Sequence, residues 1–328
     1  MTTRRWPVMS QAHTEQMSGP LAKADAPSTP ELAVAEAPTI QVTPSREATV
    51  GSVTVRRALP RRERRTVGPW CFVDQMGPAP FSPQHPIEIG PHPHLGLHTV
   101  TWLLSGELLH RDSLGSEQVI KPGQLNLMTA GNGVAHSEQT TDQYEGSMHG
   151  VQLWVAQPER TRFGDPAFEH HEELPQAALH SGTATVLVGE FAGAASTARA
   201  DTPMVGVELA LRNGTSTLQL RTDFEYAAVV MEGSMLVGDE RISPGALAYF
   251  GEGRDELEVA AVEPARVLFI GGEPFPEKVL MWWNFVARSR EEVDAARSAW
   301  EERDQRFGQS GWTLPRVSAP EVPWAGRG

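Results

Sequence analysis

Two short histidine motifs supply the residues of this chain that are best suited to chemistry. The first, PHPHLGLHTV at residues 91–100, holds His92 and His94, whose side chains would share one face of a β-strand because strand side chains alternate. The second, GNGVAHSEQT, repeats the spacing with His136 and Glu138. Two facing strands would supply three imidazoles and one carboxylate. That ligand set suits iron, manganese, nickel, copper or zinc, and it leaves positions open for water, oxygen or substrate.

The spacing of an HxH pair is a weak motif by itself, so a structural or surface role stays open. An internal echo, in which the second half of the chain repeats the sequence pattern of the first, favours a chemical role for the histidines. Each half of the chain has a strand, a turn at Gly106 or Gly233, a polar loop and a Pro-Gly turn before the next strand. Aligning the two turns places Gln219, Arg221 and Glu225 opposite positions 92, 94 and 98. A fold that needed histidines for packing would need them in both halves.

His98 is the third histidine of the first motif, and its role is less definite. At position i+4 from His94 it stays on the same strand face, so it could be a fifth ligand, a hydrogen-bond donor to a ligand, or a packing residue. We expect it to line the pocket or to contact a ligand. Five apolar residues are candidate pocket walls, and about half of them should face away because strand side chains alternate: Val100, Trp102, Leu125, Leu127 and Met128.

The remaining histidines carry weaker expectations. His110 and Asp112 alternate on one strand face beyond the turn, and we expect a structural role for them. His149 adjoins an apolar strand and is not assigned to the pocket. His170 and His171 are expected in a polar loop, FEHHEELP.

Composition excludes several classes of protein. The 328 residues carry a formal net charge of −13, which disfavours direct binding to nucleic acid. The single cysteine, Cys71, rules out an internal disulfide, fits a reducing compartment and is expected to be buried. No apolar run reaches the roughly 20 residues of a membrane span, and no apolar stretch follows the early arginine pair as an export signal would require. We therefore expect a cytoplasmic protein without a membrane partner.

The arrangement of apolar runs predicts the elements that position these motifs. Residues 1–45 are rich in Ala, Pro, Ser, Thr and Glu and are expected to form a disordered tail. Short apolar runs then alternate with Gly and Pro, which indicates an all-β sandwich or barrel. The arginine-rich segment 56–65 is expected to be a solvated edge strand, with an anionic-partner patch as the alternative.

One helix is expected near the end of the chain, over residues 289–307. Ser289 can cap its amino terminus with Glu292 reaching back. Val293, Ala296 and Trp300 recur at spacings of three and four, as on the buried face of a packing helix. Gly308 is the expected stop, and an irregular tail should follow over residues 309–328.

These segments resemble the pirin family of the cupin superfamily. The match rests on PHPHLGLHTVTWLLSGELLHRDSLGSEQVIKPGQLNLMTAGNGVAHSE, and three further segments resemble family motifs in the right order: VRRALPRRERRTVGPWCFVDQMGP, HGVQLWVAQPER and EPFPEKVLMWWNFVARSREEVDAARSAW. The resemblance covers about residues 50–306. It implies a bicupin of two jelly-roll β-barrels with a C-terminal packing helix.

The resemblance also implies a division of labour between the barrels. Residues 46–170 would form the metal-binding barrel, and residues 171–308 a barrel without metal ligands that includes the closing helix. The family's ligands carry over to His92, His94, His136 and Glu138. The metal in the family is usually iron, here Fe(II), although Mn, Ni, Cu and Zn also suit the ligands.

Some pirin-like proteins cleave flavonols such as quercetin with dioxygen, which implies a small aromatic substrate, O2 as co-substrate and Glu138 as the catalytic base. Others act as regulators, so a non-catalytic metal or redox sensor that binds a partner protein is the alternative, and an inactive structural metal barrel is a third. Two departures from the family bear on substrate and metal: many relatives have another residue where this chain has His98, and many have histidine where it has Gln75.

Overall fold

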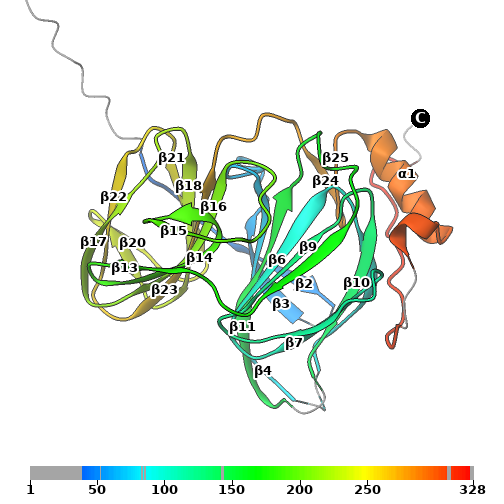
Figure 1. Cartoon of the computed structure of the whole chain (residues 1–328), viewed down its shortest axis with the longest axis horizontal. Coiled ribbons are helices and arrows are strands. Elements are labelled where there is room, and N and C mark those ends of the chain that lie inside the picture. The colour runs from blue at the N-terminus through cyan, green and yellow to red at the C-terminus, as the bar shows by residue number, and fades with distance from the viewer. Residues whose placement is uncertain are drawn as a thin grey trace, which may run out of the picture. The chain divides into compact units, whose positions relative to one another are not determined.

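The computed structural model describes residues 39–51, 53–82, 84, 86–141, 144–308 and 312–325, and these form two two-sheet β-barrels with one α-helix near the C-terminus (Figure 1). The expected all-β class, two barrels and C-terminal helix are therefore confirmed. No helix in the described part of the chain is long and apolar enough to cross a membrane.

The N-terminal barrel combines a seven-stranded sheet, in the order β12-β9-β6-β11-β4-β3-β2, with a four-stranded sheet, β5-β10-β7-β8. Neighbouring strands are antiparallel throughout. The strands are β2 (Arg46–Val50), β3 (Val53–Leu59), β4 (Trp70–Phe81), β5 (Glu88–His94), β6 (Leu97–Ser105), β7 (Leu108–Asp112), β8 (Glu117–Ile120), β9 (Leu125–Thr129), β10 (Val134–Gln139), β11 (Gly146–Ala156) and β12 (Ala167–His171).

The C-terminal barrel repeats this plan with one eight-stranded and one four-stranded sheet. The larger sheet runs β1-β21-β18-β23-β16-β14-β13, with β15 paired to β14, and the smaller runs β17-β22-β19-β20. The strands are β1 (Gln41–Pro44), β13 (Gln176–Leu179), β14 (Gly182–Phe191), β15 (Ala194–Ala195), β16 (Met204–Leu211), β17 (Gly214–Gln219), β18 (Glu225–Glu232), β19 (Met235–Val237), β20 (Glu240–Ile242), β21 (Ala246–Gly251), β22 (Glu256–Ala261) and β23 (Ala265–Gly272).

The expected end of the disordered tail at residue 45 is wrong. Strand β1 pairs along its whole length with β21, so residues 41–44 complete the edge of the C-terminal barrel's larger sheet. The composition of this stretch gave no apolar alternation, because an added edge strand is held mainly by backbone hydrogen bonds. The rest of the expected tail, residues 1–38, lies outside the described residues.

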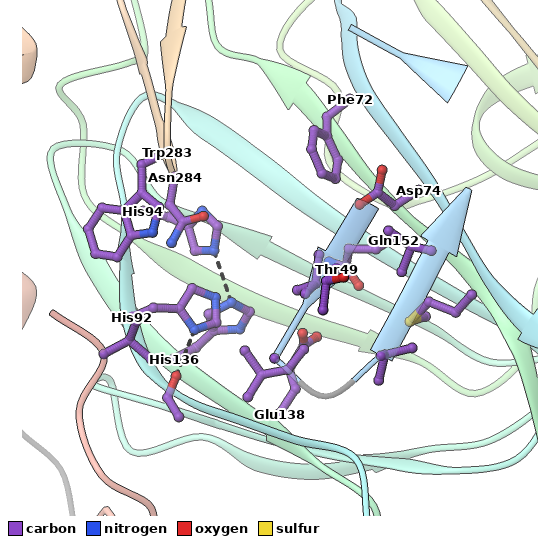
Figure 2. A pocket seen from close by; sticks show the side chains of 18 of the residues that line it. Thr49, Phe72, Asp74, His92, His94, His136, Glu138, Gln152, Trp283 and Asn284 are labelled. Atoms are coloured by element: carbon purple, nitrogen blue, oxygen red, sulfur yellow. Dashed lines mark hydrogen bonds between the residues drawn. The ribbon is translucent and has the colours of Figure 1, made fainter. Parts of the chain in front are cut away.

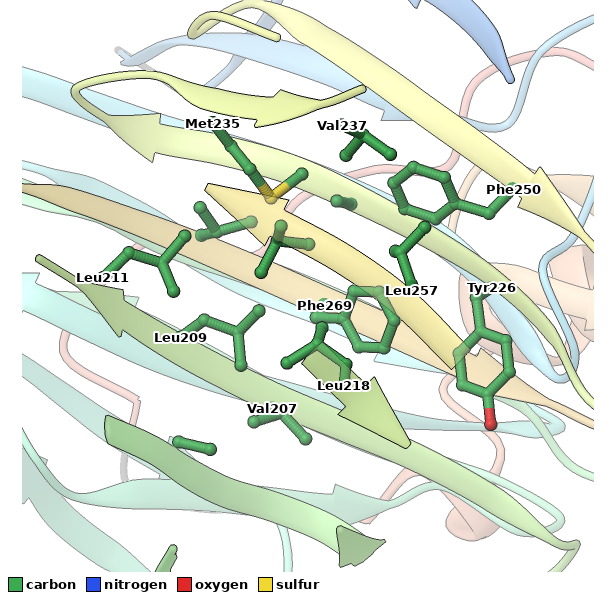
Figure 3. Packing of buried hydrophobic residues seen from close by; sticks show 14 of the residues in the cluster. Val207, Leu209, Leu211, Leu218, Tyr226, Met235, Val237, Phe250, Leu257 and Phe269 are labelled. Carbon is green, nitrogen blue, oxygen red and sulfur yellow. The ribbon is translucent and has the colours of Figure 1, made fainter. Parts of the chain in front are cut away.

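The interior of the C-terminal barrel is filled by apolar side chains. Its strands alternate buried and exposed positions, as in β17 and β22, which pair through Leu218 and Leu257 (Figure 3). Phe250 and Phe269 are fully buried at its centre. The positions that the echo aligned with His92 and His94 are exposed on this barrel. The same frame therefore encloses a hydrocarbon core here.

The expected turns of the echo are confirmed. Gly106 and Gly233 have φ values of 91° and 68°, and the glycines of the two Pro-Gly turns, Gly123 and Gly245, have φ values of 86° and 89°. These left-handed conformations favour glycine because it lacks a Cβ atom. A strand follows each Pro-Gly turn, β9 in the first barrel and β21 in the second.

The two barrels share a buried interface made largely of aliphatic side chains. One cluster joins Val100, Leu125 and Leu127 of the first barrel with Val229 and Leu268 of the second. Polar contacts also join the two barrels. The fully buried Trp70 donates from Nε1 to the carbonyl oxygens of Val205 and Gly271, at 3.1 Å each, and Gly68 N–H donates to Glu225 at 2.6 Å.

The C-terminal segment contains β24 (Leu280–Trp282), β25 (Phe285–Ala287), helix α1 (Arg290–Glu301) and the short 3₁₀ helix η1 (Gln305–Phe307). Ser289 caps α1 through the amide of Glu292, as expected, and Val293, Ala296 and Trp300 form its buried face. The Glu292 carboxylate accepts from Arg288 N–H rather than from the cap residue.

The helix ends before the expected residue 307. Arg303 adopts a left-handed conformation with φ of 62°, and its amide bonds to Trp300 O while Asp304 N–H bonds to Ala299 O. This is the hydrogen-bond pattern of a Schellman stop, built without the glycine that usually marks it. The stop expected at Gly308 therefore lies five residues beyond the observed one at Arg303.

This segment packs on the N-terminal barrel, although the sequence grouped it with the C-terminal one. Leu95 and Ala135 share a buried cluster with Phe285, Val293 and Trp300, and Leu95 bridges directly to Phe285. The chain thus crosses back to cover the outside of the smaller sheet that carries β5 and β10.

Replacing Trp70 with Phe tests the interface. The substitution removes the shared donor, leaves two buried carbonyls less well satisfied and opens a cavity, so we expect the free energy of unfolding to fall by about 2–4 kcal/mol. Urea unfolding followed by circular dichroism measures this. Trp324→Phe is the matched control, because its indole donates to Asp294 at an exposed site, and it should cost less than about 1 kcal/mol. Equal losses in the two variants would contradict the assigned role of Trp70.

Candidate metal centre

The histidine motifs lie on neighbouring antiparallel strands of the smaller sheet. Strand β5 carries His92 and His94, and β10 carries His136 and Glu138. In the register, His136 pairs with His92, and Glu138 pairs with Ile89 because a register shift falls between His136 and Glu138. The pairs are therefore side by side in one sheet rather than on facing strands as the sequence suggested.

The three imidazoles form a compact group. Their ring centroids lie 4.4 Å apart for His92 and His136, 4.8 Å for His94 and His136, and 5.0 Å for His92 and His94. One nitrogen of each ring lies within 4.8 Å of those of the others, and all three residues are buried. Figure 2 shows the rings gathered on one side of a pocket, with Glu138 beside them.

Three hydrogen bonds bear on which ring nitrogens carry lone pairs. His92 Nδ1–H donates to the carbonyl of Gly90 at 2.9 Å, so in the neutral ring Nε2 is free to bind an ion. His110 donates from Nε2 to Asp112 at 3.2 Å, and its Nδ1 lies 3.3 Å from Nδ1 of His136. A His136 tautomer that donates from Nδ1 in this contact presents its Nε2 lone pair to the other two rings.

The electrostatics keep these rings neutral near pH 7. Burial lowers the pKa of His92 to about 4, with a smaller contribution from His110. Burial, followed by repulsion from His92, lowers the pKa values of His94 and His136 well below the usual value for histidine. Neutral imidazole is the form that binds a metal ion.

The spacing of the nitrogens fits a metal ion. His94 Nε2 and His136 Nε2 lie 3.0 Å apart. Two imidazole nitrogens that bind one ion at about 2.1 Å and at a right angle are separated by about 3.0 Å. The donor set of neutral imidazoles with a neighbouring carboxylate is one that first-row transition metals accept.

Glu138 belongs to a second group, in which its carboxylate lies within 4.8 Å of nitrogens of His110 and His136. Burial raises the pKa of Glu138. The sequence gave His110 a purely structural role, but the structure places it in direct contact with His136 and stacks its ring on Phe168 at 4.4 Å. Its alternation with Asp112 was the available signal, and only the pairing of β7 with β10 shows that it points to the cluster.

Asp112 holds His110 in place. Its Oδ1 accepts hydrogen bonds from the amides of Leu114 and Ser116, at 2.9 Å each, while Oδ2 faces His110. Burial alone would raise the pKa of Asp112, but the bonds from His110 and Ser116 outweigh it and the pKa is lowered. A carboxylate that orients a histidine next to a metal ligand is a common support of metal sites.

The imidazoles open into a cavity of about 510 Å³. Trp154 lies edge-on to His94 at 5.3 Å and stacks on Phe72 at 4.0 Å, so one aromatic wall leads away from the histidines. At its far end Arg57 and Asp74 form a bidentate pair at 2.7 and 2.6 Å. The remaining lining includes Val53, Val55, Met76, Ile89, Gln152, Trp283, Asn284 and Val317.

The other expected pocket residues lie elsewhere, so those expectations are wrong. His98 is buried between Thr129, at 2.9 Å, and Asp201 of the C-terminal barrel, at 3.1 Å. Trp102 packs in the cluster between the barrels, because β6 turns that face toward the second barrel. Met128 packs behind the wall, in the cluster that contains Phe72 and Trp154.

The other wall candidates, Val100, Leu125 and Leu127, also face the second barrel and not the cavity. His149 lies beside Gln75 and Glu232, outside the cavity lining. His170 and His171 belong to strand β12, which pairs with β9, and not to a loop. Cys71 is buried as expected, and burial raises the pKa of its thiol to about 12.

Comparisons with known proteins find relatives that match both halves of the chain. The family model described as Pirin matches residues 52–155, and the one described as Pirin C-terminal cupin domain matches residues 206–308. A Pseudomonas aeruginosa protein provisionally named a quercetin 2,3-dioxygenase is 48% identical over 84% of this chain and 87% of its own. Human pirin is 32% identical over 77% of this chain and 88% of its own.

Among solved structures, quercetin 2,3-dioxygenase from Acinetobacter baumannii superposes with a TM-score of 0.84. It is 41% identical, and the match covers 87% of this chain and 96% of that one. The likeness extends over both barrels and shows that the fold is that of cupin-type proteins of this group.

The lowered pKa values predict how acid affects the metal-free protein. An unfolded histidine binds a proton below about pH 6.5, whereas His92, His94 and His136 resist it when folded, so stability must fall as pH drops below 6.5. These three groups contribute a slope of up to about 4 kcal/mol per pH unit, which the raised pKa of Glu138 opposes by at most one proton. His149 and His170, whose pKa values burial also lowers, change stability in the same direction as the three.

Urea midpoints of the metal-free protein at pH 7.5, 6.5 and 5.5 measure this slope. His136→Gln should make it shallower by about one proton, and His180→Gln, at an exposed position, should leave it unchanged. A slope equal in wild type and His136→Gln would mean that this ring is not held neutral by the fold.

Proposed function

The chain belongs to the pirin family, and from that premise we propose that it is a metal-dependent dioxygenase that opens flavonol-type substrates of the quercetin kind. The observation that carries the proposal is the group of three buried neutral imidazoles at the end of a 510 Å³ cavity with an aromatic wall. The names of the Acinetobacter and Pseudomonas relatives support the choice of substrate class.

The residues that would hold the metal are His92, His94 and His136, with Glu138 as the fourth ligand or as a base beside it. We propose iron as the resident metal, since it accepts imidazole and carboxylate ligands, and Mn, Ni, Cu and Zn share that preference. When bound, the ion supplies open positions for the substrate oxygen and dioxygen and the electron transfer between them.

Glu138 is the residue best placed to manage the proton. A flavonol must lose the proton of its 3-hydroxyl group before it reacts, and a carboxylate whose pKa is raised by burial is a stronger base than one in water. In the overall reaction two carbon–carbon bonds of the central ring break and both atoms of O2 enter the ring-opened ester. The ring carbon between the two broken bonds leaves as carbon monoxide, so no external reductant is needed. Glu138 returns its proton to the product.

The cavity orients the substrate and excludes water. Trp154 and Phe72 offer a flat apolar surface that begins at His94, which suits a planar aromatic molecule. The Arg57–Asp74 pair at its far end presents carboxylate oxygens, each with a further lone pair, to hydroxyl groups on the distal ring.

Loss of a ligand tests the metal site. We expect His94→Ala to lose at least tenfold in metal affinity, because an imidazole ligand is removed from a buried set. Metal content after dialysis, measured by inductively coupled plasma mass spectrometry, is the readout. His171→Gln is the control, since that ring lies on β12 beside Glu169 and outside the site. Equal metal content in both variants would overturn the ligand assignment.

Replacing Glu138 with Gln tests its role as base. In metal-loaded protein we expect oxygen uptake with quercetin to fall by about 10²–10⁴-fold, which is the usual contribution of a positioned acid–base group. Metal content measured on the same samples separates loss of the base from loss of a ligand. Wild-type protein that holds metal but consumes no oxygen with quercetin would contradict the dioxygenase and favour the non-catalytic regulator.

A further inference from the structure

The chain segment after α1, residues 312–325, lies directly against the strand that carries the first two histidines, and we call it the C-terminal strap. Figure 1 shows it in red, beside α1 and β10. Val317 N–H donates to the carbonyl of Pro91 at 2.8 Å, and Trp300 Nε1 donates to the carbonyl of Val317 at 2.9 Å. These two hydrogen bonds fix the backbone of Val317 beside Pro91, the residue that precedes His92.

Gly90 shows how close this approach is. A Cβ atom at that position would lie 2.1 Å from the carbonyl oxygen of Pro315. The φ of Gly90 is outside the left-handed region, so the strap is what requires glycine here. The carbonyl of Gly90 also accepts the hydrogen bond from His92 Nδ1, which connects the strap to the orientation of that ring.

The far side of the strap is fastened to α1. The guanidinium of Arg316 lies 3.6 Å from the ring centre of Trp300 and donates to its carbonyl. Ala319 N–H donates to the Glu301 carboxylate at 2.7 Å. The strap is therefore a fixed part of this side of the barrel, with bonds to the helix and to the histidine strand.

Val317 is the strap residue that reaches the cavity. It lines the cavity together with Trp283 and Asn284, yet 37% of its surface is exposed, which places it at the mouth. An apolar side chain at the rim of a pocket offers contact area to a ligand. The strap lies beyond both matched family ranges, which end at residues 155 and 308.

We propose that the C-terminal strap is a specificity-determining wall of this site. Val317 contacts the apolar face of the bound substrate at the mouth of the cavity. The close approach of Pro315 to Gly90 and the hydrogen bond from Val317 to Pro91 position the His92 strand. The substrate part of this inference rests on the proposed function, whereas the positioning part does not.

The first experiment replaces Val317 with Ser in the full-length, metal-loaded protein. We expect KM for quercetin to rise about three- to tenfold with kcat unchanged, because apolar contact is lost equally in the ground and transition states. Val262→Ser is the matched control, since this valine is also exposed, at 54%, but belongs to the second barrel. An unchanged KM for Val317→Ser in an active enzyme would overturn the contact while leaving the dioxygenase intact.

The second experiment needs no activity. In metal-free protein, Gly90→Ala should displace the strap and speed hydrogen exchange of the Val317 amide at least tenfold, while amides inside α1 keep their rates. Unchanged exchange at Val317 would overturn the positioning role. If quercetin neither reacts with the wild type nor quenches its tryptophan fluorescence, the proposed function and the substrate contact are wrong, and this exchange result alone decides whether the strap holds the His92 strand.

Discussion

Placing three imidazoles side by side inside a β-barrel is the constraint on which the rest of this structure depends. Burial lowers their pKa values, so the rings are neutral, and neutral rings in contact bring the lone pairs of their unprotonated nitrogens close together. Such an arrangement is costly unless a cation receives those lone pairs. The pairing of β5 with β10 creates the cluster, and the contacts around it fix the ring orientations: Gly90 for His92, and the Asp112–His110 pair for His136.

The two barrels share one arrangement of strands but differ in what their interiors contain. The first barrel encloses a cavity with polar groups at both ends. The second barrel fills the corresponding space with Phe250, Phe269 and aliphatic residues. A filled barrel is a rigid support, and it braces the first through the indole of Trp70 and through Asp201, which holds His98. His98 thus serves the junction between the barrels. Asp201 also accepts from Thr161 and Gln157, so this carboxylate joins β6 to the segment that follows β11.

Local patterns in the sequence were reliable where the reason for them is local. Strand alternation placed His92 with His94 and His136 with Glu138, and the glycine turns of the echo were recovered because left-handed backbone favours glycine. The pattern failed where two faces of a strand are both buried. Val100 and Trp102 on β6 are apolar and buried, as the alternation predicts. The face that they share packs against the second barrel, however, and not against the cavity. The predicted end of the helix was wrong for a related reason. Arg303 adopts a left-handed backbone conformation, which its residue type does not predict.

By itself, the sequence determined the class of the fold, the two-fold echo, the residues able to bind a metal and the family, because each of these follows from residue type at short spacing. Only the tertiary structure decided which strands are neighbours, and with that the entry of His110 into the cluster, the exit of His98 from the pocket and the course of residues 312–325 across the His92 strand. These contacts join positions tens to hundreds of residues apart. They depend on how sheets pack and where the chain returns, and no periodicity along the chain encodes that.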